Sequence, residues 1–349
     1  MTLKAAFTKK MGSFELDANI EFGNETVAIL GASGSGKSMM LKCIAGMLKP
    51  DSGTIEVDGR MLFDSVAGIN VPPRERGVGM LFQSYALFPN MTVVQNITAG
   101  MRPGGGDASR LVGLFRLEGL EKKYPRQLSG GQQQRVATAR MLASEPRLIL
   151  LDEPFSALDS HLKWSIEREI AERLSDFAGT TVLVSHNRDE AYRMSDRIAI
   201  MDSGRCSAPT DKHEFFENPR TVPAAVLSGC KNIMKASKSG EREVFVEEWG
   251  RHVETASDVP RDTGYLGVRS HAVSLGEGDN TMRCTVRDVI EGPFEHTLML
   301  TVDGPPPCEG RLGTSVLYAD VDRRGCKHMP GKGDSIDVSI PKASILLLA

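Results

Sequence analysis

A glycine-rich stretch with one lysine and one serine has the residue types that hold a phosphate chain. It follows an apolar run at residues 27–30 and precedes a helix-forming run at residues 39–48. Glycines let backbone N–H groups curl round phosphates, because a side chain would block the approach or forbid the dihedral angles. The stretch predicts a strand, a phosphate-binding loop and a helix whose N-terminus favours anions. Its residues are Gly31, Ala32, Ser33, Gly34, Ser35, Gly36, Lys37 and Ser38.

Two side chains of this loop have predicted tasks toward a nucleotide. Lys37 would reach the β- and γ-phosphates, and the hydroxyl of Ser38 would be a ligand of Mg²⁺. The loop alone leaves a second interpretation open, a glycine turn capped by a surface lysine. Other motifs along the chain have to decide between the two.

Two adjacent carboxylates, Asp152 and Glu153, end a second apolar run at residues 148–151. Asp152 would hold Mg²⁺ through water, and Glu153 would polarise the water that attacks the γ-phosphate. Such a pair alone is usually only a strand end, but its place downstream of the phosphate loop favours catalysis. His186 ends a third apolar run, residues 181–185, in the same way.

The elements around these residues have the order of an α/β fold. Apolar strands that end in polar residues and lead into helices are typical of a parallel sheet covered on both faces, with ligand sites at the carboxyl ends of the strands. Beyond residue 230 the helical period disappears, and alternation with period two between Gly, Pro and Asp turns predicts a small β-barrel. We therefore predict an α/β domain at residues 1–229 and an all-β domain at residues 230–349.

Length and composition fit a two-domain globular protein. The chain has 349 residues and a formal net charge of −3 from 42 basic and 45 acidic residues, which gives no reason to expect a nucleic acid partner. No apolar stretch approaches the roughly 20 residues of a membrane span, and the N-terminus lacks a secretion signal, so the cytoplasm is expected. The six cysteines are scattered, which argues against a zinc site or a redox pair.

The stretch Leu-Ser-Gly-Gly-Gln at residues 128–132 distinguishes this chain from many other families that share a phosphate loop. Together with that loop, Gln83 after a strand, the segment 152–154, the segment 156–159 and Ser185-His186, it resembles the ATP-binding subunit of an ATP-binding cassette (ABC) transporter. The resemblance covers roughly residues 1–229. It implies the P-loop NTPase fold of ABC nucleotide-binding domains, a mainly parallel sheet flanked by helices with a helical subdomain, and an ATPase coupled to transmembrane transport.

The same resemblance implies a homodimer paired head to tail, with ATP and Mg²⁺ as cofactors. Each ATP would lie between the phosphate loop of one subunit and a signature motif of the other. Gln83 would sense the Mg²⁺ and the attacking water, Asp159 would line the dimer seam, and His186 would donate a hydrogen bond to the γ-phosphate as a neutral imidazole. The signature residues are Ser129, Gly130, Gly131 and Gln132. The implied Mg²⁺ ligands are Ser38, Gln83 and Asp152, and the implied catalytic residues are Glu153, His186 and Gln83.

One position departs from the family pattern. Members of the family usually stack adenine on an aromatic residue about twenty residues before the phosphate loop, and Met11 stands at that place. A thioether packs on a ring face less specifically than Tyr or Trp. Phe14 or Phe7 could take over the contact, although both also suit a core.

Residues 84–93 are apolar around Pro89 and leave two interpretations open. They could form the core of a helix. In the family this segment forms a groove that receives a short helix of the transmembrane permease subunit, so its apolar residues would be exposed for function. The protein would then lie peripherally on the cytoplasmic face of the cell (inner) membrane, and an extracytoplasmic solute-binding protein would be an indirect partner.

The β-rich tail resembles the OB/TOBE-like regulatory extension of importer ATPases, and residues 60–100 look most like the molybdate importer's ATPase. Import of molybdate or a related oxyanion is therefore the expected function, while sulfate, ferric iron, polyamine and sugar importers share the layout. Two other classes stay open. A non-transport ABC ATPase is disfavoured because the chain has one phosphate loop and no sustained heptads, and a pure oxyanion sensor is disfavoured because every catalytic position is intact.

Overall fold

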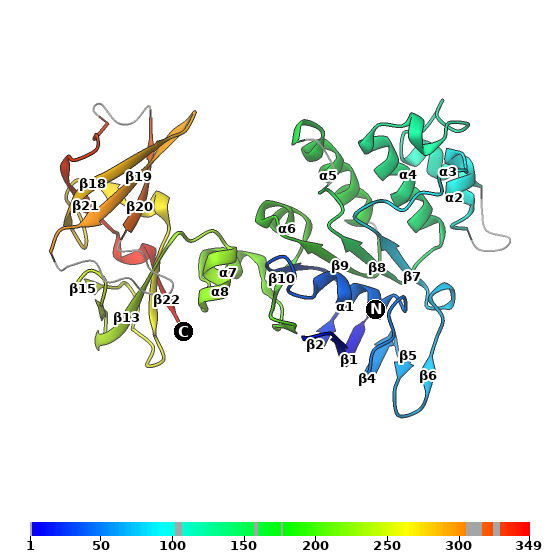
Figure 1. The fold of residues 1–349 in the computed structure, drawn as a ribbon, viewed down its shortest axis with the longest axis horizontal. Coiled ribbons are helices and arrows are strands. Elements are labelled where there is room, and N and C mark those ends of the chain that lie inside the picture. Colours follow the sequence, from blue (N-terminus) through cyan, green and yellow to red (C-terminus); the bar gives the residue numbers. More distant parts are fainter. Residues whose placement is uncertain (1, 102–106, 157–159, 176, 305–315, 324–328) are drawn as a thin grey trace. The chain divides into compact units, whose positions relative to one another are not determined.

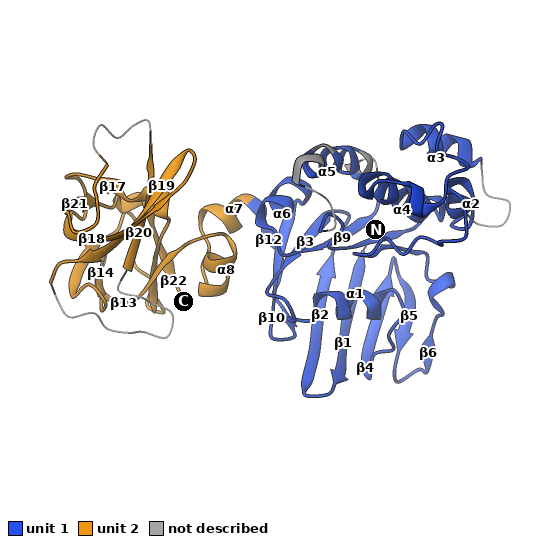
Figure 2. Ribbon diagram, turned by 45° about the horizontal axis from the view of Figure 1, so that its top comes forward, with its two compact units in different colours: residues 1–212 blue, residues 213–349 orange. Residues whose placement is uncertain are grey.

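The computed structural model describes residues 2–101, 107–156, 160–175, 177–304, 316–323 and 329–349. The chain forms two compact units, Met1–Lys212 and His213–Ala349 (Figure 2). The sequence pattern predicts a domain boundary after Gly229, and a functional division at that residue stays a prediction. The structural units divide earlier because α8 (Val222–Leu227) packs within the second unit, where buried Ala225 joins Ile233 and Leu348 in one apolar cluster.

The first unit is built on a 12-stranded mixed sheet (Figure 1). Its strands are β1 (Leu3–Met11), β2 (Phe14–Phe22), β3 (Thr26–Leu30), β4 (Ser52–Val57), β5 (Arg60–Asp64), β6 (Ile69–Asn70), β7 (Val78–Leu81), β8 (Leu148–Asp152), β9 (Thr180–Ser185), β10 (Arg197–Asp202), β11 (Arg205–Cys206) and β12 (Thr210–Asp211). They follow the order β6-β5-β4-β1-β2-β11-β10-β3-β9-β8-β7, and β12 pairs with β10.

The site-bearing part of this sheet is parallel. Strands β10, β3, β9, β8 and β7 pair in parallel, and β8 and β9 are buried along their whole length. Strands buried on both faces read as continuous apolar runs, which explains the patterns at residues 27–30 and 148–151. The N-terminal strands instead pair antiparallel, β1 with β2 and β4, so the sheet is mixed. The predicted fold class is confirmed.

The helices of the first unit include a small helical subdomain. They are α1 (Lys37–Ile44), α2 (Val93–Thr98), α3 (Ala108–Leu114), α4 (Gly130–Ala143), α5 (Ser160–Ser175) and α6 (Arg188–Met194), with 3-10 turns η1 (Pro73–Glu75) and η2 (Pro125–Gln127). Helices α2, α3 and α4 share an apolar cluster that includes Ile97, Phe115 and Val136, and they lie together in Figure 1. Thr92 and Ser129 begin α2 and α4 as capping boxes, which satisfies N–H groups at both helix starts.

A buried arginine fixes the far end of α1. Arg76 is 1% exposed, and its guanidinium donates to the carbonyls of Cys43 (3.0 Å), Ile44 (2.8 Å) and Val71 (2.8 Å). It also donates to Oδ1 of Asn70 (3.0 Å). The last carbonyls of a helix lack helical partners, and a cation there also favours the helix dipole. Arg76 therefore anchors the C-terminus of the helix whose N-terminus carries Lys37.

The second unit consists of two five-stranded antiparallel sheets that enclose an apolar core, together with α8 and most of α7 (Lys212–Glu217). One sheet has the order β15-β14-β13-β16-β22 and the other β17-β21-β18-β19-β20. Asn232 links them, because its side chain donates to the Tyr318 carbonyl (2.9 Å) and accepts from the Tyr318 N–H (2.7 Å).

The second unit has the β-barrel-like character that the alternation predicted. The strands are β13 (Asn232–Gly240), β14 (Glu243–Val246), β15 (Arg251–Glu254), β16 (Tyr265–Val268), β17 (Ser274–Leu275), β18 (Met282–Glu291), β19 (Glu295–Val302), β20 (Val316–Asp322), β21 (Ser335–Ser339) and β22 (Ile345–Leu348), with 3-10 turns η3 (Ser270–Ala272) and η4 (Lys342–Ser344).

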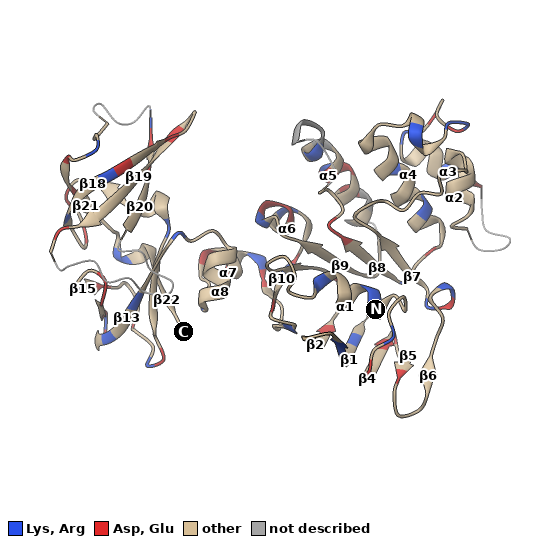
Figure 3. Cartoon of the chain, viewed as in Figure 1, with Lys and Arg blue, Asp and Glu red and all other residues tan. Residues whose placement is uncertain are grey.

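Acidic and basic residues are interspersed along the elements of both units (Figure 3). Within the described ranges, none of the helices has both the length and the apolar character to cross a membrane.

Candidate active site

The glycine-rich stretch forms a tight loop between β3 and α1. Gly36 has a φ of 107°, a region that L side chains rarely adopt, and a Cβ on Gly31 would lie 2.2 Å from the carbonyl oxygen of Met201. Lys37 is 5% exposed, and its Nζ donates to the carbonyls of Gly31 (2.8 Å) and Ala32 (2.8 Å). Burial lowers the pKa of Lys37, while the charges of the nearby carboxylates oppose that shift. The loop thus surrounds an ammonium group, as the phosphate-loop prediction requires.

Ser38 and Asp152 meet beside this loop. The Ser38 hydroxyl donates to Oδ1 of Asp152 at 2.7 Å, and Asp152, the last residue of β8, is buried. Burial raises the pKa of Asp152, and the hydrogen bond from Ser38 opposes that shift. In the described part of the chain, no group of three or more His, Cys, Asp or Glu side chains is arranged so that it could by itself hold a metal ion. A hydroxyl and one carboxylate are oxygen ligands of the kind Mg²⁺ takes together with phosphates and water.

Three predicted catalytic residues come together from three neighbouring strand ends. Nε2 of Gln83, just past β7, donates to Oε2 of Glu153 at 3.4 Å. Nδ1 of His186, just past β9, lies 3.3 Å from Oε1 of Glu153. Each oxygen of the Glu153 carboxylate therefore faces one of its two neighbours.

The backbone of Glu153 is itself unusual. Its φ is 45°, in the left-handed region that favours glycine, and its N–H donates to the carbonyl of Val184 at 3.0 Å. A non-glycine residue persists there only where the surroundings hold it, and such residues cluster at functional sites. No sequence pattern predicts this backbone conformation, and the hydrogen bond to Val184 of β9 joins residues far apart in the chain.

A cleft of about 410 Å³ opens between the phosphate loop and the start of β2. Of the three candidates for the adenine contact, Met11 and Phe14 line this cleft, whereas Phe7 is 2% exposed and belongs to the core. Met11 is 54% exposed. Phe14 lies so close to Gly36 that a Cβ there would approach its ring to 3.0 Å. The remaining lining residues are Ser33, Gly34, Gly36, Lys37, Ser38, Met39 and Glu153.

The signature residues lie at the start of α4. Oγ of Ser129 accepts from the Gln132 N–H (3.4 Å), and Oε1 of Gln132 accepts from the Ser129 N–H (3.0 Å). Ser129 and Gly130 are exposed, so this helix start is open to a second molecule. Gly131 is buried against α5, since a Cβ would lie 2.6 Å from Ile166. Asp159, predicted for a dimer seam, lies outside the described residues.

The apolar segment after Gln83 is a loop, and only its last residue, Val93, belongs to a helix. The helix-core interpretation therefore does not hold for residues 84–92. Phe88 is 46% exposed and Met91 is 37% exposed, whereas Tyr85 is buried. Asn96, fully buried on α2, accepts from the Phe88 N–H (2.9 Å) and donates to the carbonyls of Phe88 and Met91. The loop thus presents two apolar side chains from a fixed backbone.

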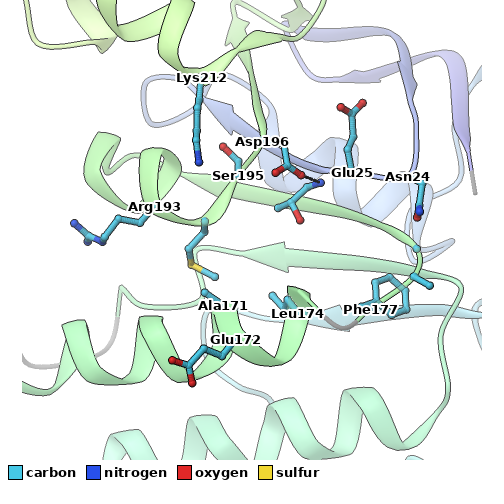
Figure 4. Close-up of a pocket in the computed structure, with 14 residues that line it drawn as sticks. Asn24, Glu25, Ala171, Glu172, Leu174, Phe177, Arg193, Ser195, Asp196 and Lys212 are labelled. Atoms are coloured by element: carbon cyan, nitrogen blue, oxygen red, sulfur yellow. Dashed lines mark hydrogen bonds between the residues drawn. The ribbon is translucent and has the colours of Figure 1, made fainter.

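A second cavity, of about 640 Å³, lies at the opposite ends of the parallel strands, near the starts of β3 and β10 (Figure 4). Its charged groups already have partners within the protein. Asp196 accepts from the Thr26 N–H (2.8 Å), Arg193 pairs with Glu167, and Nζ of Lys212 lies 5.6 Å from the centre of the Tyr192 ring. We assign this cavity no ligand.

Comparison with known proteins identifies the family. The family model described as ABC transporter matches residues 16–156. The spermidine/putrescine import ATP-binding protein of Rubrobacter xylanophilus is 36% identical, covering 94% of this chain and 89% of the relative. The sulfate/thiosulfate import ATP-binding protein of Chromobacterium violaceum is 37% identical, covering 97% and 93%. The Fe(3+) ions import ATP-binding protein of Streptomyces avermitilis is 36% identical, covering 100% and 98%.

A solved structure agrees with this result. It is described as the dimeric structure of a post-hydrolysis state of an ATP-binding cassette bound to ADP and Pi. It matches with a TM-score of 0.50 and 31% identity, covering 61% of this chain and 99% of its own. The chain therefore belongs to the ABC transporter family, as the ATP-binding subunit of an importer and an ATPase.

Proposed function

We propose that this protein hydrolyses ATP in a head-to-tail homodimer and thereby drives import of a small solute through transmembrane permease subunits. The observation that carries the proposal is the meeting of Gln83, Glu153 and His186 beside the phosphate loop. These three residues lie far apart in the sequence and reach one carboxylate from three strand ends. Such convergence is what hydrolysis of a bound phosphate chain requires.

The phosphate loop binds and orients the nucleotide. Without a nucleotide, the ammonium group of Lys37 donates to two carbonyls of the loop. A bound phosphate chain would offer this ammonium charged oxygen acceptors, which form stronger hydrogen bonds. Ser38, Asp152 and Gln83 are the residues proposed to hold Mg²⁺, which supplies positive charge that offsets the charge on the phosphates. The 2.7 Å separation of the Ser38 and Asp152 oxygens puts two suitable oxygen donors side by side.

Glu153 acts as the general base. Its carboxylate takes a proton from water as the water oxygen bonds to the γ-phosphorus, and the bond from that phosphorus to the bridging oxygen of ADP breaks. Without nucleotide, Gln83 and His186 lie one at each oxygen of the carboxylate, and Gln83 keeps the base oriented once ATP is bound. The left-handed backbone of Glu153 supports this task, because it turns the Glu153 side chain away from the direction that a continued β8 strand would give it.

The proton on His186 limits what this ring can do at one moment. A carboxylate only accepts hydrogen bonds, so a hydrogen bond across the 3.3 Å between Nδ1 of His186 and Oε1 of Glu153 would use a proton on Nδ1. A neutral imidazole has one proton, so it cannot donate from Nε2 to the γ-phosphate while it donates from Nδ1 to Glu153. We propose that His186 exchanges Glu153 for the γ-phosphate when ATP binds, which frees one oxygen of the base.

The second subunit completes each site in this proposal. Ser129, Gly130, Gly131 and Gln132 of one subunit contact the ATP held by the other, and Asp159 lines the seam. The exposed start of α4 and the dimeric form of the similar solved cassette support this arrangement. A helix N-terminus favours an anion through its free N–H groups and its dipole. Met11, with Phe14 beside it, is the proposed adenine contact because both line the cleft.

Phe88 and Met91 form the proposed contact with the permease, which places the protein peripherally at the cytoplasmic face of the membrane. Residues 230–349 form the proposed regulatory domain, and a solute-binding protein is an indirect partner. The relatives cited above are named for polyamines, sulfate/thiosulfate and ferric ions, so these solutes replace molybdate as the first candidates.

Uptake measurements distinguish the candidates. Cells that lack this subunit are compared with complemented cells for uptake of labelled spermidine, sulfate, ferric iron and molybdate. Import of one solute should depend on the subunit, and the Lys37→Ala variant should fail to restore it. Equal uptake of all four solutes with and without the subunit would contradict the proposed solute classes.

A further inference from the structure

We propose that Arg140 is a positioning residue that holds the loop between Gln83 and Phe88 and ties it to α4. This inference rests on the proposed function, because it assumes that Gln83 serves hydrolysis and Phe88 contacts the permease. Arg140 lies on the helix that Ser129 begins. It would link the signature end of α4, the catalytic glutamine and the permease contact.

The guanidinium of Arg140 contacts three residues of this loop. Nη2 donates to the carbonyl of Tyr85 at 2.9 Å, and Nη1 donates to the carbonyl of Ala86 at 2.8 Å. Its Cζ lies 5.1 Å from the centre of the Phe88 ring. A planar guanidinium can use its edge for two acceptors and its face for a ring, which an ammonium cannot do at once.

The backbone conformation of this loop requires stabilising contacts. Tyr85 has a φ of 58° and Ala86 a φ of 45°, so two successive residues with side chains adopt the left-handed region. That conformation is unfavourable for L residues and persists only where the surroundings impose it. The two carbonyls that Arg140 binds belong to these two residues. Asn96 holds the other end of the loop at Phe88, so Arg140 and Asn96 together fix the backbone between Gln83 and Met91.

Helix α4 packs closely against the chain after α2 at Arg140. A Cβ on Gly100 would lie 2.1 Å from the carbonyl oxygen of Arg140, so the chain after α2 packs directly on the helix backbone. Arg140 lies eleven residues after Ser129, about 16 Å along a helix that rises about 1.5 Å per residue. A displacement of the signature end by a nucleotide would therefore reach the Gln83 loop through a rigid helix and two charged hydrogen bonds.

The test compares Arg140→Gln and Arg140→Lys with Gln83→Ala and with a matched control, Arg135→Gln. Arg135 is on the same helix, but its guanidinium pairs with Glu169 at 3.1 Å instead of binding the loop. The melting temperature, the KM for ATP and kcat are measured for each variant, and ATP consumed per solute imported is measured in the complex with its permease. All kinetic measurements are made at a temperature at which circular dichroism shows every variant folded.

Arg140→Gln should lower kcat about ten- to hundredfold, as expected for a misplaced catalytic group, with KM for ATP within about twofold of wild type. It should also raise the ATP consumed per solute. Arg140→Lys should recover part of both, because an ammonium can bind one carbonyl. A lower melting temperature with unchanged kcat and coupling in Arg140→Gln and Arg140→Lys would overturn the inference. If Arg140→Gln does not fold, Arg140→Lys alone decides, and wild-type kcat and coupling in it would overturn the inference. Wild-type kcat in Gln83→Ala would instead contradict the proposed function.

Discussion

Replacement of Arg76 by methionine should destabilise the first unit far more than an ordinary surface substitution. Methionine is unbranched and apolar, reaches two atoms less far than arginine and has no donors, so Arg76→Met removes the bonds to Cys43, Ile44, Val71 and Asn70 while still filling the space of the aliphatic stem. The carbonyl of Cys43 keeps the N–H of Gly46 as a partner. Of the other three acceptors, Asn70 belongs to an exposed residue, so two acceptors lose a partner inside the protein, the carbonyls of Ile44 and Val71.

The expected loss follows from that count. A buried acceptor left without a partner costs about 1–3 kcal/mol, so losing the partners of two such acceptors should lower the free energy of unfolding by about 2–6 kcal/mol. In a domain of roughly 200 residues this corresponds to about 2–4 °C of melting temperature per kcal/mol. Arg74→Met is the matched control, because that side chain is 85% exposed and pairs only with its neighbour Glu75 among the ion pairs described. It should change stability by less than about 0.5 kcal/mol.

Urea unfolding followed by far-UV circular dichroism measures both variants. The two units can unfold separately, so the transition that responds to added ATP identifies the first unit. Arg76→Lys should fall between wild type and Arg76→Met, since an ammonium keeps the charge but cannot span four acceptors. A value for Arg76→Met within about 0.5 kcal/mol of Arg74→Met would refute the reasoning that these buried hydrogen bonds anchor α1.

Three further predictions concern the site, the permease contact and the thiols. Gly31→Ala should abolish tight ATP binding measured by calorimetry, because the new Cβ would lie 2.2 Å from the Met201 carbonyl oxygen, and affinity like that of wild type would contradict this. Phe88→Asp should leave ATP affinity unchanged while transport falls, because it places a charge in an apolar contact, and unchanged transport would return Phe88 to an incidental surface role. Burial raises the pKa values of the Cys43 and Cys284 thiols from 9.0 to about 12, so both should react with iodoacetamide at pH 8 only after unfolding. Because these pKa values are raised in the folded state, the stability they contribute is present below pH 9 and is lost as the pH rises toward 12.

The sequence predicted those parts of the site that depend on local patterns. The phosphate loop, the carboxylates at the end of β8 and the histidine at the end of β9 follow from apolar runs that end in particular residues, because a buried parallel strand leaves its functional residues at its carboxyl end. These residues do converge in the structure.

Features that depend on distant contacts could not be read from the chain. The N–H of Glu153, whose backbone is left-handed, donates to Val184 of β9, and the loop at residues 84–92 is bound by Arg140 and Asn96 from two helices. The boundary between the two units could not be predicted from the sequence either, because only the packing of α8 against strands of the second unit assigns this helix to that unit. The antiparallel pairing of β1 with β4 likewise joins segments separated by a whole β-α unit.

Replacement of Glu153 by glutamine tests the central claim most directly. Glutamine keeps the shape and a carbonyl oxygen but removes the charge that accepts the proton, so ATP should still bind through Lys37, Ser38 and Asp152. Hydrolysis should fall by about a hundredfold to ten-thousandfold, the typical contribution of a general base. Size-exclusion chromatography with ATP and Mg²⁺ should then show an accumulated dimer for Glu153→Gln and monomer for Lys37→Ala. Hydrolysis by Glu153→Gln within a few-fold of wild type, with no dimer accumulating, would contradict the account.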